Sequence, residues 1–248
     1  MMWTIDLNGH TAVITGGTRN IGLATAQALL AHGAKVCIVG GSDQGALTDA
    51  LEILGGESNH VAGLLASVAD DTDIRRIFDF TEQRLGSVSI LINGAANRPH
   101  QPFIEISRDQ WNAVIDVALT GPFRLTQELF KRLPPEQNGA IVNLGGLSAH
   151  KPVIDRPHVI AAKAGLMGLT KATAAEGMGR IRVNMVVPGA IDTHRKPGQS
   201  VPHKASEPGV MPPGSAADVA RAILPFADPS DLYVTGQTVH VNGGRFMP

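Results

Sequence analysis

Short runs of apolar residues alternate along the chain with longer stretches in which apolar residues recur every three or four positions. The short runs have the length of strands and lie at Thr11–Thr15, Lys35–Val39, Val61–Leu65, Ser89–Asn93, Ala140–Leu144, Arg182–Val187 and Thr238–Val241. The longer stretches, such as Ile21–His32 and Asp71–Leu85, have the period of amphipathic helices. Strands that alternate with helices predict βαβ units. We therefore expect an α/β fold of Rossmann type, with a doubly wound, mainly parallel seven-stranded sheet and helices on both faces.

The alternation shows neither an internal repeat nor a linker, so we expect residues 1–248 to form a single domain. Residues 193–214 depart from it, with five prolines, three glycines and no useful periodicity. A loop of this length in a compact domain is typically a lid or binding loop, or else it is disordered. We expect a substrate lid, with a mobile surface loop as the alternative. Its basic side chains favour a carboxylate or phosphate on the substrate, although solvation explains them equally: His194, Arg195, Lys196, His203 and Lys204.

Composition narrows the class of protein. Hydrophobic residues make up 43% of the chain and charged residues 17%, which is enough for a core and atypical of disorder. The formal net charge of −1 argues against a nucleic-acid partner. The single cysteine, Cys37, lies in an apolar run typical of core and suits a reducing cytoplasm. We find no secretion signal and no apolar run of the roughly 18 residues that a membrane span requires, and we expect no metal site.

A glycine-rich turn, Thr15–Gly22, joins the first predicted strand directly to a helix. Glycines allow a sharp turn and let backbone N–H groups approach a pyrophosphate, and the helix N-terminus adds partial positive charge. A second strand follows after about 20 residues, which is the context that a dinucleotide site requires. The turn therefore predicts a dinucleotide site, with a purely structural turn as the alternative.

Several segments together resemble the short-chain dehydrogenase/reductase family over nearly the whole chain. They are the Thr15–Gly22 turn, Asn93–Ala96 after the fourth strand, Val183–Thr193, and Tyr233–Gly244 near the C-terminus. Asn20 replaces the middle glycine of the first motif, which is a mild change because Asn tolerates left-handed backbone angles. The resemblance implies a nicotinamide cofactor and redox chemistry on a carbonyl/alcohol pair.

The resemblance also implies which residues contact the cofactor. These residues are Gly16, Thr18, Arg19, Asn20, Ile21, Gly22, Gly41, Ser42, Ser67, Val68, Asn93, Gly94, Ala95, Lys163, Pro188, Gly189, Ile191 and Thr193. NAD-binding proteins usually carry an acid at the end of the second strand, but here none precedes Asp43. Arg19 resembles the basic residue with which NADP-preferring members meet the 2′-phosphate. Gly41 lies where many of those members carry a second Arg. We expect NADP in preference to NAD.

The family exchanges a proton through a Tyr, a Lys four residues later, a Ser about thirteen residues before the Tyr, and an Asn in the preceding helix. The ammonium lowers the pKa of the Tyr from about 10, and a spacing of four puts both side chains on one helical face. Lys163 matches the Lys, which puts Val159 at the Tyr position, Gly146 at the Ser position and Ala118 at the Asn position. Because valine exchanges no proton, the family mechanism cannot operate here as written.

Other residues are candidates for the missing chemistry. In the family the lysine also binds the nicotinamide ribose, so Lys163 supports cofactor binding and says little about turnover. Ser148 and His150 follow the fifth strand at its carboxyl end, where open α/β sheets bind ligands, and either could hold or protonate a substrate oxygen. Arg98 and His100 follow the fourth strand and could bind an anionic substrate group. For each of these four residues a surface or capping role stays open. Our catalytic candidates are Lys163, His150 and Ser148.

Three functions remain open. The first is an NAD(P)-dependent oxidoreductase that acts on a small carbonyl or alcohol substrate through a non-standard proton donor. The second is a non-redox enzyme, such as an isomerase or lyase, and the third is a dinucleotide-binding pseudoenzyme. Lys163 and the segment that follows Pro188 favour the first two functions, whereas the missing Tyr and Ser favour the third. The resemblance further implies a homodimer or homotetramer, formed through helices at Asp109–Arg132 and Pro157–Met178.

Overall fold

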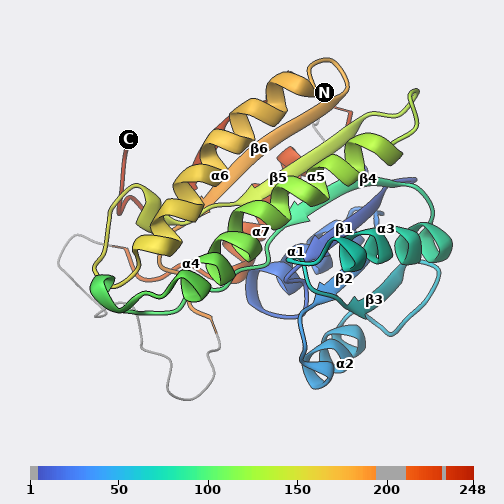
Figure 1. Cartoon of the computed structure of the whole chain (residues 1–248). Coiled ribbons are helices and arrows are strands. Elements are labelled where there is room, and N and C mark those ends of the chain that lie inside the picture. The colour runs from blue at the N-terminus through green and yellow to red at the C-terminus, as the bar shows by residue number, and fades with distance from the viewer. Residues whose placement is uncertain (1–4, 194–210, 231–232) are drawn as a thin grey trace.

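A single seven-stranded sheet forms the centre of the computed structural model, which describes residues 5–193, 211–230 and 233–248 (Figure 1). The strands are β1 (Thr11–Thr15), β2 (Lys35–Gly40), β3 (Val61–Leu65), β4 (Val88–Asn93), β5 (Gly139–Leu144), β6 (Ile181–Pro188) and β7 (Thr238–Val241). Each predicted strand is present, and its bounds differ from the prediction by no more than one residue at either end. The apolar runs therefore located every strand of the sheet.

The strand order is β3-β2-β1-β4-β5-β6-β7, and all the pairings are parallel. Chain order reverses between β1 and β4, and Thr15 at the end of β1 pairs with both Val39 and Asn93. The carboxyl ends of the first, second and fourth strands therefore lie next to one another. Open α/β sheets bind ligands at such a switch point. The predicted Rossmann-type, doubly wound fold is confirmed.

Helices cover both faces of the sheet, as Figure 1 shows. They are α1 (Asn20–Ala31), α2 (Gln44–Ile53), α3 (Asp71–Leu85), α4 (Arg108–Ile115), α5 (Gly121–Arg132), α6 (Pro157–Glu176) and α7 (Ala216–Ala227). Ile14 packs on one face with α1, α2 and α7, whereas its neighbour Val13 packs on the other with α3, α5 and α6. This alternation follows from the two-residue period of a strand and explains why the strand sequences are apolar throughout.

A π-helical turn at Asp116–Thr120 joins α4 to α5, so the predicted helix Asp109–Arg132 is one helical run with a local bulge. A Cβ atom at Gly121 would lie 2.6 Å from the carbonyl oxygen of Val68, so only glycine lets this run approach the end of β3. Such bulges often occur beside functional sites. Here the bulge contains Ala118, the position at which the family carries Asn.

Cys37 lies within the sheet and is fully buried. Burial raises the pKa of its thiol to about 12, so the thiolate does not form at neutral pH and the side chain behaves as core. Within residues 5–193, 211–230 and 233–248, no helix has the length and apolar character needed to cross a bilayer.

Only the two ends of the predicted lid belong to the described residues. Ile191 bridges to Gly214, and the backbone N–H of Asp192 donates to the carbonyl of Gly214 at 2.8 Å. The segment therefore leaves and rejoins the sheet edge at one place. Its basic residues lie outside the described part of the chain, and so does their predicted contact with substrate: His194, Arg195, Lys196, His203 and Lys204.

Candidate dinucleotide and active site

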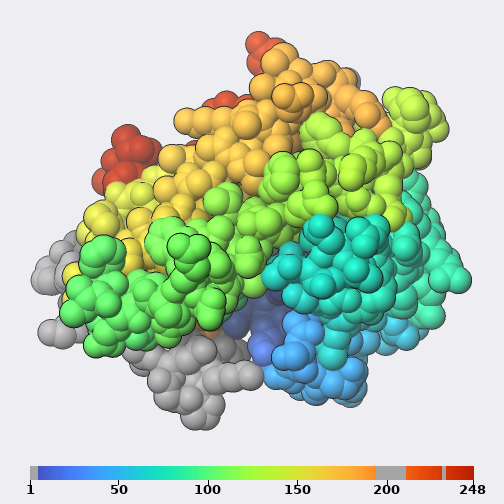
Figure 2. Space-filling model, viewed as in Figure 1, coloured from blue at the N-terminus to red at the C-terminus, as the bar shows by residue number. Residues whose placement is uncertain are grey.

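The predicted cofactor residues converge at the carboxyl edge of the sheet, around the switch point between β1 and β4. In the space-filling view a hollow separates the green α4–α5 side from the light-blue α2, and the dark-blue N-terminal segment lies recessed between them (Figure 2). The glycine-rich turn, which joins β1 to α1, belongs to that segment.

Three glycines allow backbone segments at this edge to approach too closely for any side chain. A Cβ atom added at Gly16 would lie 2.8 Å from the carbonyl oxygen of Gly94. One added at Gly22 would lie 2.1 Å from the carbonyl oxygen of Gly16, and one added at Gly94 would lie 2.7 Å from the carbonyl oxygen of Thr15. Gly16 also has a φ of +69°, and Asn20 has a φ of +49°, in the left-handed region. Asn20 thus takes the conformation for which the family uses glycine, as predicted. The close backbone packing suits the approach of a pyrophosphate.

The N-terminus of α1 lacks a side-chain cap, as do those of α5 and α6, and in this it differs from those of α2, α3, α4 and α7. Each of these four begins with an Asp or Ser side chain that accepts from a backbone N–H of its first turn. Helix α1 begins after Arg19 without a side-chain cap and has no acidic residue in its first turn. The partial positive charge at this terminus is therefore not offset by a local carboxylate or cap, which suits an anion. The first turn of α1 fits the pyrophosphate of a dinucleotide.

Arg19 forms an ion pair with Asp43, with 2.6 Å between Nη2 and Oδ2. Asp43 also caps α2 by accepting from the backbone N–H of Ala46. The pair holds the guanidinium beside the end of β2. Gly41 lies at this end of the site in open space, and a Cβ atom there would meet nothing within 4 Å.

The remaining predicted cofactor residues lie at the ends of β3, β4 and β6. Ser67 follows β3 and its backbone N–H donates to Asp73 at 2.7 Å, while Val68 is buried. Gly189 follows β6 so closely packed that a Cβ atom would lie 2.6 Å from Cα of Asn242. The structure therefore brings to one edge of the sheet all of these residues: Gly16, Thr18, Arg19, Asn20, Ile21, Gly22, Gly41, Ser42, Ser67, Val68, Asn93, Gly94, Ala95, Pro188, Gly189, Ile191 and Thr193.

A buried polar network supports the glycine turn, and the sequence reasoning missed it. The Thr15 hydroxyl accepts from the backbone N–H of Gly94 at 3.1 Å and of Ala95 at 3.3 Å. The Asn93 amide donates to Asn143 at 2.8 Å, and Asn143 donates to the Thr170 hydroxyl at 2.9 Å. The available signal was that polar residues end two apolar strands, which is costly unless they are hydrogen-bonded. The network fixes β4, β5 and α6 relative to one another.

Lys163 is buried, with 5% of its surface exposed, and its Nζ donates to the Leu144 carbonyl at 2.6 Å. Burial, with a smaller effect of the charge of Arg98, lowers the pKa of Lys163 from 10.5 to about 8. The ammonium therefore lies at the end of β5, next to Gly146. Lysine at this place can donate hydrogen bonds to a ribose or exchange a proton near neutral pH.

Val159, at the position of the family's Tyr, is 2% exposed and packs with Val114, Ala118 and Ala162. Ala118, at the position of the family's Asn, belongs to the same apolar cluster. At Gly146 a Cβ atom would make only ordinary contacts, 3.6 Å from Cγ of Lys163 and 3.7 Å from Oγ of Ser148. Two of the three predicted positions are thus part of the core, whereas the third has room for a Cβ atom. The sole tyrosine, Tyr233, is 97% exposed.

His150 and Ser148 lie in the short helical turn that follows β5. Ser148 faces Gly146 and so lies on the Lys163 side of this turn. The His150 ring packs on His240 and Phe246, with centroids 4.5 Å and 5.5 Å away, and burial lowers its pKa below the ordinary 6.5. His150 is therefore held against the C-terminal end of the chain, a placement that the sequence did not indicate.

Two loops are joined across the mouth of the site. The backbone N–H of Gln101 donates to the Asp155 carbonyl at 2.9 Å, and the Arg156 guanidinium contacts Nε2 of His100. Arg98, in the same loop as His100, lies near enough to Lys163 to lower its pKa. The loop after β4 therefore brings the charge of Arg98 near Lys163, and the loop after β5 is joined to it.

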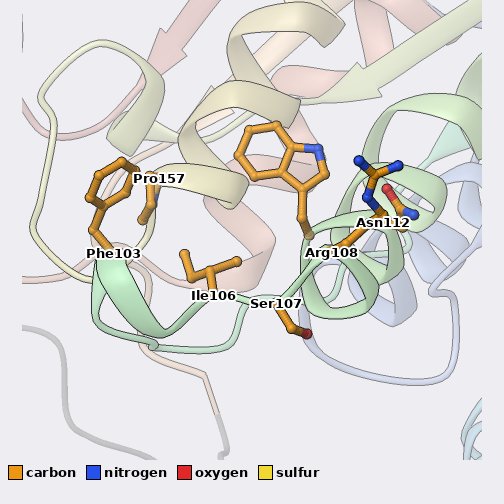
Figure 3. Close-up of a pocket in the computed structure, with 7 residues that line it drawn as sticks. Phe103, Ile106, Ser107, Arg108, Asn112 and Pro157 are labelled. Atoms are coloured by element: carbon orange, nitrogen blue, oxygen red, sulfur yellow. The ribbon is translucent and has the colours of Figure 1, made fainter.

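A pocket of about 560 Å³ lies beside the site, between the loop after β4 and the beginnings of α4 and α6. Figure 3 shows Phe103 beside Pro157 at one end of it and Arg108 beside Asn112 at the other. Its volume is typical of small-molecule sites. None of the predicted cofactor residues lines it, so the pocket is separate from the dinucleotide cleft, and sequence patterns did not reveal it.

The described ranges contain no three His, Cys, Asp or Glu side chains placed together as metal ligands. Taken together, the parallel sheet, its switch point, the glycine-rich turn and the uncapped helix define a dinucleotide-binding α/β protein.

Comparisons with known proteins narrow this class. The sequence model of a family described as enoyl-(acyl carrier protein) reductase matches residues 16–245. The 3-oxoacyl-[acyl-carrier-protein] reductase FabG of Salmonella typhimurium is 32% identical over 247 residues, covering 98% of this chain and 100% of the relative. Nodulation protein G of a Rhizobium species is 32% identical over 247 residues, covering 98% and 99%. A crystal structure from Brucella melitensis, described as a short-chain dehydrogenase/reductase (glucose/ribitol dehydrogenase), has a TM-score of 0.86 at 26% identity, covering 99% and 100%.

The chain belongs to the short-chain dehydrogenase/reductase family, and it is an oxidoreductase of that type. The family resemblance of the sequence is confirmed. The comparisons leave the substrate, the proton donor and the preference between NADP and NAD as predictions.

Proposed function

We propose that the protein is an NADP(H)-dependent oxidoreductase that interconverts a small carbonyl compound and its alcohol through a proton-exchanging group other than tyrosine. The glycine cradle carries this proposal, because Gly16, Gly22 and Gly94 leave no room for side chains where a pyrophosphate would approach. The uncapped N-terminus of α1 gives the same pocket its preference for an anion. Arg19, held at the end of β2 by Asp43, favours a 2′-phosphate and hence NADP.

A bound nicotinamide supplies or accepts the hydride. Lys163 would donate hydrogen bonds to the nicotinamide ribose from the end of β5, where its Nζ donates to the Leu144 carbonyl. Ser148 holds the substrate oxygen in place of the serine that Gly146 lacks, because its hydroxyl lies 3.7 Å from the Cβ position of that residue. His150 exchanges the proton, because an imidazole titrates near neutral pH.

The substrate is a small molecule with an anionic group and an apolar part. Arg98 and the contact between Arg156 and His100 favour the anion, and the pocket lined by Phe103 and Trp111 suits the apolar part. The related reductases are named for 3-oxoacyl groups on acyl carrier protein. Short 3-oxoacyl thioesters therefore form the first set of substrates to test.

Two measurements test the proposal. Fluorescence titration with NADPH and NADH should show binding of both, with NADPH tighter, and binding of neither would refute the cofactor site. Absorbance of reduced nicotinamide is then followed with carbonyl and alcohol panels. His150→Ala should lower turnover by about 10² to 10⁴, the usual contribution of a general acid or base. Unchanged turnover in this variant would refute the role of His150.

A non-catalytic dinucleotide-binding protein is the second candidate function. The observation that favours it is the burial of Val159 and Ala118 in one apolar cluster, where the family has polar side chains. This candidate requires NADPH binding without turnover on any carbonyl or alcohol. A full substrate panel, combined with the titration above, separates the two functions.

We further propose a homodimer or homotetramer formed through the helical run α4–α5 and through α6. Trp111 and Phe123 on this run are 39% and 38% exposed, and a Cβ atom at Gly168 of α6 would meet nothing within 4 Å. Apolar rings beside small residues permit close approach of another copy. Light scattering checks this, and a monomeric mass would contradict it. A cytoplasmic location also stays our prediction.

A further inference from the structure

His150 belongs to a cluster of three rings drawn from distant parts of the chain. His240 in β7 lies edge-on to it, with an interplanar angle of 75°, and Phe246 from the C-terminal tail closes the cluster at 5.2 Å from His240. Nδ1 of His240 is buried and has no hydrogen-bond partner among the described residues. The cluster is thus held by ring packing rather than by hydrogen bonds to His240.

A tight turn after β7 brings Phe246 back to this place. Gly243 and Gly244 have φ angles of +61° and +75°, which side chains other than glycine rarely adopt. The Asn242 amide then donates to the Phe246 carbonyl at 2.8 Å, and the backbone N–H of Arg245 donates to the Asn242 carbonyl at 3.2 Å. The glycine pair near the C-terminus therefore serves to fold the tail onto His150.

The backbone at His150 is fixed separately. The N–H groups of Ala149 and His150 donate to the carbonyls of Gly146 and Leu147, each at 3.0 Å. With the backbone held by the helical turn, the orientation of the imidazole is decided by the rings that touch it.

We propose that His240 and Phe246 are positioning residues, which hold the His150 ring in one orientation and exclude water from part of it. This inference rests on the proposed function in that His150 exchanges the proton. It adds a role for β7 and the C-terminal tail, neither of which contacts the glycine cradle in the interactions described above.

The cluster also determines which form of His150 is present. Burial lowers the pKa of His150, and burial together with the charge of His150 lowers the pKa of His240. Within the described part of the chain no carboxylate raises the pKa of His150, so nothing there stabilises an imidazolium. His150 is neutral at pH 7, which makes it a proton acceptor.

A neutral imidazole favours the direction that oxidises an alcohol. In that direction the alcohol O–H proton would move to the His150 ring nitrogen as the C=O bond forms, and a bound oxidised nicotinamide would accept the hydride from the carbon. The imidazolium then returns its proton to water. Alcohol oxidation is therefore expected to increase as the pH rises through the pKa of His150.

Histidine NMR titration of the whole protein tests the positioning role without a substrate. The His150 signal is assigned with His150→Gln, and its pKa is compared between the wild type, Phe246→Ala and His240→Ala. Both variants let water reach the ring, so the pKa of His150 should rise toward 6.5. His240→Phe keeps the ring packing and should retain the lowered pKa.

Two controls make the result specific. Met247→Ala alters the same tail at a residue that is 81% exposed, so it should leave the pKa of His150 unchanged. His10 lies just before β1, at the opposite edge of the sheet, so its own pKa should be the same in every variant. Phe246→Leu replaces the alanine variant if that one unfolds. An unchanged pKa of His150 in the Phe246 and His240 variants would overturn the proposal. No substrate is used in this titration, so its failure would refute the positioning role alone. Unaltered turnover in His150→Ala would instead refute proton exchange by His150.

Discussion

The carboxyl edge of the sheet has two parts, which differ in how closely their residues match the pattern of the family. Around β1 and β4, the site is made of backbone, with glycines at which a Cβ atom would lie 2.1 to 2.8 Å from a carbonyl oxygen. Around β5 and α6, the family's site is made of side chains, and here Val159 and Ala118 have become core. The backbone around β1 and β4 is thus packed for close approach, whereas the positions predicted for the reacting side chains are apolar.

This difference follows from how the two parts are built. A backbone cradle depends on the packing of the sheet and its first helix, so altering it disturbs the fold. Side-chain chemistry depends on a few positions at which apolar residues also pack well. Val159 illustrates this, because it fills an apolar cluster with Val114 and Ala162 at 2% exposure.

The largest expected effect comes from restoring the family's side chains with Val159→Tyr and Gly146→Ser together. A tyrosine beside Lys163 has the ammonium that it needs as an acid, so carbonyl reduction should rise by about 10² to 10⁴. Gly146→Ser alone fits the space and serves as the control. Tyrosine overpacks the cluster, so the variant should also be less stable by about 1–3 kcal/mol. Reduced-nicotinamide absorbance and urea unfolding measure the two effects, and no gain in a folded double variant would show that more than these side chains has been lost.

Disturbing the backbone part is the next test. Gly22→Ala places a Cβ atom 2.1 Å from the Gly16 carbonyl oxygen, so the turn must shift. NADPH affinity should fall about tenfold or more, because the backbone N–H groups that face the pyrophosphate move out of hydrogen-bond distance. Gly41→Ala lies in the same site in open space and should change affinity little. Fluorescence titration compares the NADPH affinities of the two variants. Equal affinities would mean that the glycine cradle does not bind the cofactor.

The pH dependence of stability sharpens the comparison at Lys163. Its folded-state pKa of about 8 lies below the ordinary 10.5, so the unfolded chain binds the proton more tightly and stability rises as the pH goes from 8 to 10.5. Relative to Lys163→Met, the unfolding free energy of the wild type should increase by roughly 2 kcal/mol over this range. Urea unfolding at both ends of the range measures it. A pH-independent difference would mean that burial does not lower the pKa.

The smallest effect concerns the choice between the two nicotinamide cofactors. Arg19→Gln removes the guanidinium from the end of β2, so NADPH affinity should fall about tenfold, as expected for one charge-assisted hydrogen bond. NADH affinity should not change. Asp43→Asn, which releases Arg19 from its ion pair, should strengthen NADPH binding instead. Equal losses for both cofactors in Arg19→Gln would contradict the proposed preference for NADP.

Much of the fold and of the binding site could be predicted from sequence. Strands that are buried on both faces give continuous apolar runs, as Cys37 and Ile38 in β2 illustrate. This pattern does not depend on distant residues. The turn Thr15–Gly22 is equally local, because strand, glycines and helix are contiguous. Hydrogen bonds between distant residues leave no such pattern. The link from Asn93 through Asn143 to Thr170 spans 77 positions and became apparent only when β4, β5 and α6 lay together.

By itself, the sequence determined the order of the elements, the position of the glycine-rich turn and the identity of the side chain one helical turn before Lys163. These are local properties, set by hydrophobic period, glycine and spacing. Only the tertiary structure decided that Val159 is sealed in an apolar cluster, that Asp43 holds Arg19, and that Phe246 returns to His150. Such contacts join segments far apart in the chain, and their energies depend on burial that exists only once the sheet and its helices have assembled.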